Sequence, residues 1–72
     1  MRSKVFRSRL RDQVLVTTHN GSTFSGVLWE CDDKALVLRN AAAVGAGPDK
    51  SNLPLDGEIV ILLFDVAYIQ RP

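Results

Sequence analysis

Residues 13–31 read QVLVTTHNGSTFSGVLWEC, and this stretch decides the fold. In its first part, residues 13–18, Val14 and Val16 alternate with the other side chains, as in a strand with one buried face. Asn20-Gly21 then suits a tight turn, because both residue types tolerate a positive φ angle. The stretch therefore predicts a hairpin whose second arm is a long strand over residues 23–31.

A glycine interrupts that second strand. Phe24, Gly26, Leu28 and Glu30 fall on one face of it, and Trp29 falls on the other. Glycine in the middle of a strand usually marks a sharp bend or a bulge. We expect a sharp bend or a bulge at Gly26.

Further strands follow on the C-terminal side. A turn at residues 32–34 leads into a strand over 35–41 that carries Leu36 and Leu38 on one face, and 42–56 is a loop rich in glycine and proline. Two last strands are expected over 58–64 and 66–70. Five short antiparallel strands around a bent one predict a mainly β fold, a small closed or nearly closed barrel.

On the N-terminal side, residues 3–11 predict a short helix, with Ser3 as its N-cap and apolar residues near one face. Its other face is strongly basic. Five of the nine basic residues of the chain lie in the first eleven positions: Arg2, Lys4, Arg7, Arg9 and Arg11. Such a cluster indicates contact with nucleic acid or with an acidic partner, or a solvated face.

With 72 residues the chain forms one domain with a thin core. One cysteine and one histidine provide neither an internal disulfide nor a structural zinc site, so association is the remaining route to stability. We expect a homo-oligomer. No apolar run is long enough to span a membrane, and the N-terminus has no apolar stretch typical of a secretory signal.

Residues 14–41 and 56–69 resemble the two sequence motifs of the Sm and LSm proteins. The resemblance depends most on these positions: Gly21, Gly26, Leu28, Asp32 and Gly57. It implies a single five-stranded Sm-like (SH3-like) barrel over residues 1–72. Strands 1–3 would lie in 13–41, the loop in 42–56 and strands 4–5 in 57–70, behind the N-terminal helix.

The resemblance also implies how copies associate. Sm-like barrels commonly pair edge to edge, the fourth strand of one copy with the fifth strand of the next. The corresponding strands here, 58–64 and 66–70, are the most apolar of the chain. Candidate interface residues are Trp29, Ile59, Ile61, Leu63, Val66 and Tyr68.

One departure from the family bears on function. RNA-binding members hold a uracil base with an Asn after the second strand and an Arg-Gly pair before the last strand. Here Ala35 or Leu36 takes the place of the Asn, and Leu62 and Leu63 take the place of Arg-Gly. Leucine offers no donor to a base or a phosphate, so we expect the usual uridine site to be absent.

The C-terminal residues 57–70 are similar to small Sm-like proteins of actinobacteria and their tailed phages. We therefore expect a non-catalytic assembly module, a virion component such as a minor capsid, decoration or connector protein. It would bind its own copies and other structural proteins, and it would lie in the virion if phage-encoded and otherwise in the cytoplasm. The alternative is an RNA-binding ring that uses the basic helix.

No catalytic constellation supports an enzyme. His19 and the pair Asp32-Asp33 fall in turn signals without a nucleophile, and Cys31 has no evident activating partner. The glycine-rich stretch 45–51 lacks the order of a phosphate-binding loop. Trp29 suits an interface or the core better than a stacked base. We expect no cofactor, no metal and no small-molecule substrate.

Overall fold

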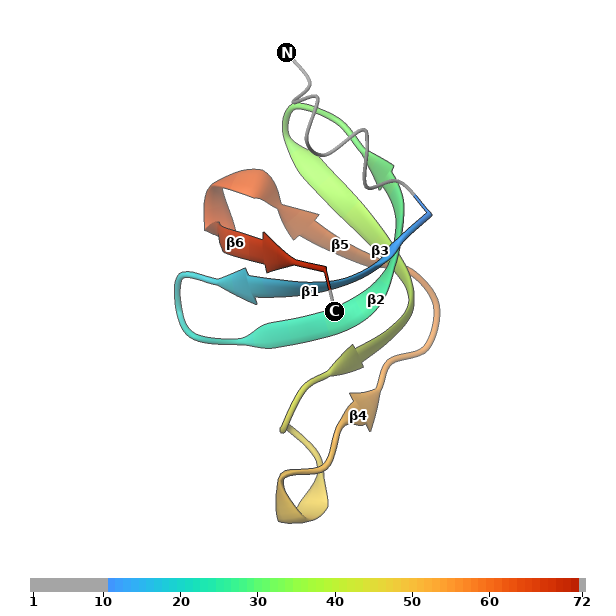
Figure 1. Ribbon diagram of the computed structural model, residues 1–72, viewed down its shortest axis with the longest axis vertical. Coiled ribbons are helices and arrows are strands. Elements are labelled where there is room, and N and C mark those ends of the chain that lie inside the picture. Colours follow the sequence, from blue (N-terminus) through green and yellow to red (C-terminus); the bar gives the residue numbers. More distant parts are fainter. Residues whose placement is uncertain (1–10, 72) are drawn as a thin grey trace.

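The computed structural model describes residues 11–71, which form one curved antiparallel sheet (Figure 1). The strands are β1 (Gln13–Thr18), β2 (Thr23–Cys31), β3 (Ala35–Ala43), β4 (Leu53–Pro54), β5 (Ile59–Leu62) and β6 (Val66–Gln70). Two 3-10 turns, η1 (Pro48–Lys50) and η2 (Leu63–Asp65), complete the elements. The described chain is thus mainly β, as expected.

The sheet wraps into an incomplete barrel. Its hydrogen-bonded order is β4-β3-β2-β1-β6, and β5 pairs with β3 beyond the bend in that strand. Long β2 and β3 take part in two halves of the barrel, because each is bent near its middle. β5 and β6 follow each other in the sequence, separated by η2, but they do not pair with each other: β5 pairs with β3 and β6 pairs with β1.

The core is small and aliphatic. It consists of one alternating set from β1, β2, β3 and β5: Val14, Val16, Leu28, Leu36, Leu38, Ala41 and Ile61. No polar or charged residue of the described chain is buried. The expected alternation in β1 and β3 is confirmed.

Gly26 marks the bend, as expected. A Cβ atom at this position would lie 3.1 Å from the Arg39 carbonyl oxygen and 3.2 Å from the Leu38 Cβ. Opposite it, Asn40 has a φ angle of 51°, and the register between β2 and β3 shifts there. A bulge in β3 and a glycine in β2 together let the two backbones approach and curve.

A second register shift lies between Leu28 and Glu30. It removes Glu30 from the inward face, so the prediction that Glu30 shares the face of Leu28 is wrong beyond the bulge. Glu30 is exposed, which is the favourable position for a carboxylate without a buried partner.

The turns are built as their residues predict. Gly21 and Gly57 have φ angles of 91° and 75°. The Asp32 carboxylate accepts hydrogen bonds from the backbone N–H groups of Lys34 and Ala35, each at 2.8 Å, and so fixes the turn between β2 and β3.

Three boundaries differ from expectation. β3 runs on to Ala43, and the predicted loop 42–56 contains η1 and the two-residue β4, so six strands replace five. These segments form a hairpin arm that projects from the barrel (Figure 1). β5 stops at Leu62 because the chain turns into η2, where the Leu63 N–H donates to the Lys34 carbonyl at 2.8 Å.

The predicted helix over 3–11 lies outside the described residues except at its end. Arg11 is in a turn with a φ angle of 70°, so the helix does not include this residue. Among the described residues no helix is long and apolar enough to cross a membrane.

Candidate functional site

Two strand edges of the barrel are unpaired. Within residues 11–71, β5 is bonded only to β3 and β6 only to β1. Each therefore presents a row of backbone N–H and C=O groups that another strand can pair with. A single chain leaves the barrel open between these two elements.

Exposed apolar side chains accompany the open edges. Val60 is 63% exposed, Leu62 45%, Phe64 76% and Tyr68 54%. Large apolar groups at an unpaired strand edge are typical of a surface that another chain covers.

A shallow groove of about 550 Å³ runs beside β5. One wall is the β1–β2 turn and the other is β5; the lining residues are Thr18, His19, Asn20, Ser22, Phe24, Ile59, Val60, Ile61, Leu62 and Asp65. The His19 N–H donates to the Asp65 carbonyl at 2.8 Å and closes one end. The groove thus lies between the β1–β2 turn and β5.

The six predicted interface residues differ in burial, and Trp29 is half-buried on β2. Ile61 is in the core, and Ile59, Leu63 and Val66 are half-buried against it. Tyr68 is exposed. Their contact with a second copy stays a prediction.

The alternation of β5 places Val60 and Leu62 outward. The sequence did not indicate these two residues and Phe64 as interface candidates. Their position within the apolar run 59–64 was the available signal, but the run gave no indication of which face is inside.

The two turns that carry the base pocket in RNA-binding Sm proteins do meet in this structure. Ala35 is the register partner of Leu62, and the Leu63 N–H is bonded to the Lys34 carbonyl. The side chains gathered here are Ala35, Leu62, Leu63 and Phe64, with Lys34 as the cation of the first turn. Whether a uridine site is absent from these turns stays a prediction.

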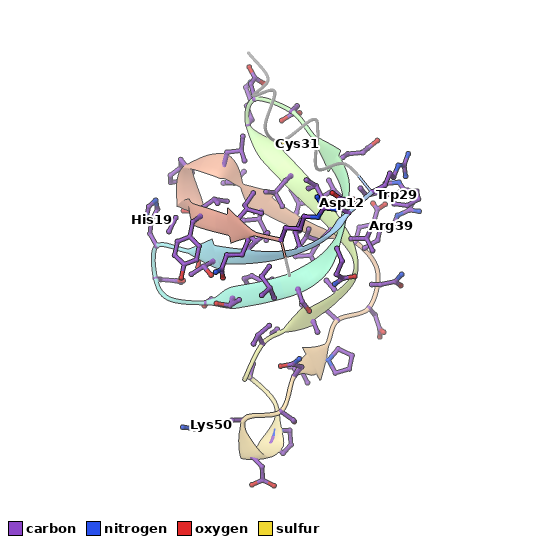
Figure 2. All side chains as sticks on the ribbon, in the orientation of Figure 1. Asp12, His19, Trp29, Cys31, Arg39 and Lys50 are labelled. Carbon is purple, nitrogen blue, oxygen red and sulfur yellow. The ribbon has the colours of Figure 1, made fainter. Side chains whose placement is uncertain are left out.

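A basic and aromatic cluster lies on the outer face of the barrel (Figure 2). The Arg11 guanidinium carbon is 3.7 Å from the centre of the Trp29 ring, and that of Arg39 is 4.2 Å from it. Both distances are within the range of a cation–π interaction. The Arg39 Nε also donates to the Glu58 carboxylate at 2.8 Å. We call Arg11, Trp29 and Arg39 the arginine–tryptophan cluster.

The sheet positions all three members. Trp29 is on β2; the Arg11 N–H donates to the Leu28 carbonyl at 2.6 Å, and Arg39 on β3 follows directly after Leu38, the partner of Leu28. Trp29 is half-buried, whereas Arg11 and Arg39 are exposed. Arg39 was missed in the sequence, because its place beside Trp29 depends on the register shift between Leu28 and Glu30.

Of the predicted basic set, only Arg11 belongs to the described chain. Arg2, Lys4, Arg7 and Arg9 lie outside the described residues. Elsewhere, residues 11–71 contain no group of three or more histidine, cysteine or carboxylate side chains placed to hold a metal ion. Cys31 is half-buried at the end of β2.

The fold is shared with Sm proteins of known structure. A heptameric archaeal Sm protein superimposes with a TM-score of 0.82 at 21% identity, covering 97% of this chain and 98% of the other. A Pyrococcus abyssii Sm protein, solved in complex with a uridine heptamer, gives a TM-score of 0.73 at 30% identity over 92% of this chain and 90% of its own. The chain belongs to the Sm-like family.

A third Sm-like structure, from Methanococcus vannielii, agrees at 19% identity and a TM-score of 0.70, covering 97% of this chain and 99% of its own. No protein-family model and no curated protein sequence matches the chain. The Sm-like assignment thus depends on the fold and on the Pyrococcus protein. None of these three structures supports the closer resemblance to phage proteins.

Proposed function

We propose that this Sm-like protein is a non-catalytic subunit of a homo-oligomeric ring that binds RNA. The observation that carries the proposal is the pair of unpaired edges, β5 and β6, in one barrel. The edges are different, so pairing β5 of one copy with β6 of the next is head-to-tail and closes into a ring at a suitable rotation. One of the similar Sm proteins is itself a heptamer.

Association would also compensate for the small stability that the core of one barrel provides. Only seven hydrophobic residues of the described chain are buried, while Val60, Phe64 and Tyr68 are more than half exposed. Burial of apolar surface contributes roughly 25 cal/mol per Å². Covering these side chains between copies stabilises each barrel more than its own core allows.

RNA is the proposed ligand for two reasons. The similar Pyrococcus protein was solved with a uridine heptamer. This chain combines a basic N-terminal segment with the arginine–tryptophan cluster. Cations next to aromatic rings commonly bind single-stranded nucleic acid.

A structural role in a protein assembly is the second candidate. It is favoured by Leu62 and Phe64, which are exposed at the turn where RNA-binding relatives carry polar donors. Such a protein would contact other structural proteins, in a virion if it is phage-encoded, as a minor capsid, decoration or connector protein. Otherwise a cytoplasmic location is expected.

The native mass of the variant Val60→Asp tests whether copies assemble through β5. A carboxylate in the middle of the β5 edge resists burial against β6 of another copy, so this variant should run as a monomer while the wild type forms a closed oligomer. Native mass spectrometry and light scattering give the subunit number.

The matched control is Val44→Asp. Val44 is 38% exposed but lies at the base of the projecting arm, away from both edges. It should leave the mass unchanged. A monomeric wild type, or an equal effect of both variants, would refute assembly through β5.

The ligand is tested by what copurifies. An RNA-binding ring should carry nucleic acid from the cell, lose it at high salt and rebind single-stranded RNA with steep salt dependence. Purified ring that neither carries nor rebinds RNA, but is found at fixed stoichiometry in a protein particle, would instead support the structural role.

A further inference from the structure

We propose that Asn20 is a site of spontaneous deamidation and that the loop between β1 and β2 promotes this reaction. The loop supplies the nucleophile, which is the Gly21 backbone nitrogen, and two hydrogen-bond donors to the side-chain carbonyl of Asn20. The product is an aspartate or an isoaspartate at the tip of the hairpin. The modification goes beyond the proposed function, because it needs neither a second copy nor RNA.

The loop is short and open to water. It lies at the free end of the β1–β2 hairpin (Figure 1), and residues 19–22 are all exposed. The Thr18 N–H donates to the Ser22 carbonyl at 2.8 Å, and the Gly21 N–H donates to the Thr18 carbonyl at 3.0 Å. With a φ angle of 91° at Gly21, this is a three-residue hairpin loop that ends in a left-handed glycine. Water and hydroxide therefore reach Asn20 and Gly21 directly.

Gly21 makes its own nitrogen an accessible nucleophile. In deamidation the backbone nitrogen that follows an asparagine attacks the Cγ atom of that asparagine, and a side chain on the following residue obstructs this approach. Glycine has no side chain, and a Cβ atom at Gly21 would meet nothing within 4 Å. The hydrogen bond from the Gly21 N–H to the Thr18 carbonyl must open first. Exposed loops open locally at a small cost in free energy, so this bond does not prevent the attack.

Two donors hold the side-chain carbonyl of Asn20. The Thr18 hydroxyl donates to the Asn20 Oδ1 at 2.5 Å, and the Ser22 N–H donates to the same oxygen at 3.2 Å. The hydroxyl is also 3.2 Å from the Ser22 carbonyl, but its shorter contact is with Asn20. Negative charge develops on Oδ1 when the nitrogen adds to Cγ. The two donors are placed to stabilise this charge, as in an oxyanion hole.

The reaction balances with water as the only co-reactant. The Gly21 amide loses its proton to hydroxide, and its nitrogen forms a bond to the Asn20 Cγ. The bond between Cγ and the side-chain nitrogen then breaks, and this nitrogen takes a proton from water and leaves as ammonia. Water opens the resulting succinimide at either carbonyl. Opening at Cγ gives aspartate, whereas opening at the backbone carbonyl gives isoaspartate.

Either product changes the groove beside β5, because Asn20 and Asp65 are both lining residues of this groove. The new carboxylate adds a second negative charge to the groove. Isoaspartate also adds a methylene to the main chain of a loop that two backbone hydrogen bonds close. The consequence for assembly rests on the proposed ring: a deamidated copy should bind its neighbour through β5 more weakly, since a charge resists burial.

Mass spectrometry of the full-length protein after prolonged incubation tests the site. Trypsin places the three asparagines of the chain in separate peptides: 12–34 with Asn20, 40–50 with Asn40, and 51–72 with Asn52. Only the first peptide should gain the mass of an amide converted to an acid. The conversion should be faster at higher pH, because the attacking nitrogen must lose its proton. The other two asparagines are not followed by glycine and serve as internal controls.

Variants of Thr18 test whether the loop promotes the reaction. Thr18→Val removes the hydroxyl but keeps the shape of the side chain, and it should slow deamidation by about 2- to 10-fold, the effect of one hydrogen bond. Thr18→Ser keeps the donor and should retain the wild-type rate. The matched control is Thr17→Val, which removes a hydroxyl that lies 3.2 Å from the Thr23 hydroxyl. This control should stay within about 2-fold of the wild-type rate.

The outcomes separate the site from its promotion by the loop. If Asn20 keeps its amide as long as Asn40 and Asn52, the site is refuted. If Thr18→Val deamidates as fast as the wild type, the Asn-Gly sequence alone sets the rate, and the role of the loop is overturned.

The native mass of Asn20→Asp tests the consequence for assembly. The variant should form less of the closed oligomer than the wild type at equal concentration. If it assembles like the wild type, the effect on assembly is refuted while the modification stands. A monomeric wild type whose Asn20 still deamidates would refute the proposed ring and support the site.

Discussion

At Gly26 one missing side chain controls the curvature of the barrel. Its backbone lies so close to β3 that even a methyl group would come within 3.1 Å of a carbonyl oxygen. Neither that carbonyl nor the Leu38 Cβ is a mobile group, since Leu38 is fully buried. The bend that brings both halves of β2 into one barrel therefore requires a glycine here.

Gly26→Ala should lower the free energy of unfolding by about 1–3 kcal/mol, the usual cost of overpacking in a core. Urea denaturation followed by tryptophan fluorescence measures this change. The control is Ser25→Ala, because the neighbouring residue points to the other face of the same strand and is only half-buried. Equal stability of the two variants would show that the strands separate without cost.

Residue-level prediction succeeds where alternation is regular. Val14 and Val16, and Leu36 and Leu38, belong to the core as their spacing indicates. It fails after each bulge, since one extra residue exchanges the faces of all that follow. Glu30 leaves the inner face for this reason, and the same register shift between Leu28 and Glu30 places Arg39 beside Trp29.

At the scale of elements, the arm between β3 and β5 differs from the barrel. It has its own hydrogen bonds: the Gly47 N–H donates to the Ser51 carbonyl at 2.8 Å, and the Gly45 N–H donates to the Asn52 side chain at 3.2 Å. No residue of the arm from 44 to 54 belongs to the buried core. The conformation of the arm therefore depends on its own hydrogen bonds and is hardly coupled to the folding of the barrel.

Gly47→Ala tests this independence. A Cβ atom here would lie 2.7 Å from the Ser51 Oγ and 3.0 Å from its carbonyl oxygen, so the arm must rearrange. Hydrogen exchange at the arm amides should become faster, while the global unfolding free energy changes by less than about 0.5 kcal/mol. A loss of stability comparable with that of Gly26→Ala would mean that the arm is part of the folding unit.

The elements themselves were largely predictable. Turn residues such as Asn20-Gly21 and the Asp32 cap fix where strands begin, and these boundaries agree with the structure. The short β4 was not predictable, because its two residues pair with β3 only after the bend has placed them together. The early end of β5 likewise depends on a bond to Lys34 from another hairpin.

At the scale of the whole molecule, stability and assembly are one equilibrium. A barrel that leaves two strand edges unpaired gains from association what its seven-residue core does not supply. Linkage then makes the folded state depend on protein concentration.

The thermal midpoint of the wild type should rise with protein concentration, since assembly removes folded monomer from the unfolding equilibrium. Differential scanning fluorimetry over a wide dilution series measures the shift. Val60→Asp should melt at a midpoint that does not change with dilution. A wild-type midpoint that is equally insensitive would argue that the single barrel is already the stable unit.

The site was less predictable than the fold. The sequence indicates a lone tryptophan, but the meeting of Arg11 and Arg39 at Trp29 depends on the register of three strands. That residues 62–63 are Leu-Leu and not Arg-Gly is visible in the sequence, because it concerns residue type rather than position.

The two open edges are unlike, and this makes each copy a link with a distinct head and tail. A copy blocked only at β5 can still join a growing assembly through β6, where it acts as a terminator. In a mixture with the wild type, small amounts of such a copy should prevent ring closure. Two defective variants, one blocked at β5 and the other at β6, should associate with each other only to a dimer. The subunit number of this mixture therefore reports the head-to-tail order of assembly.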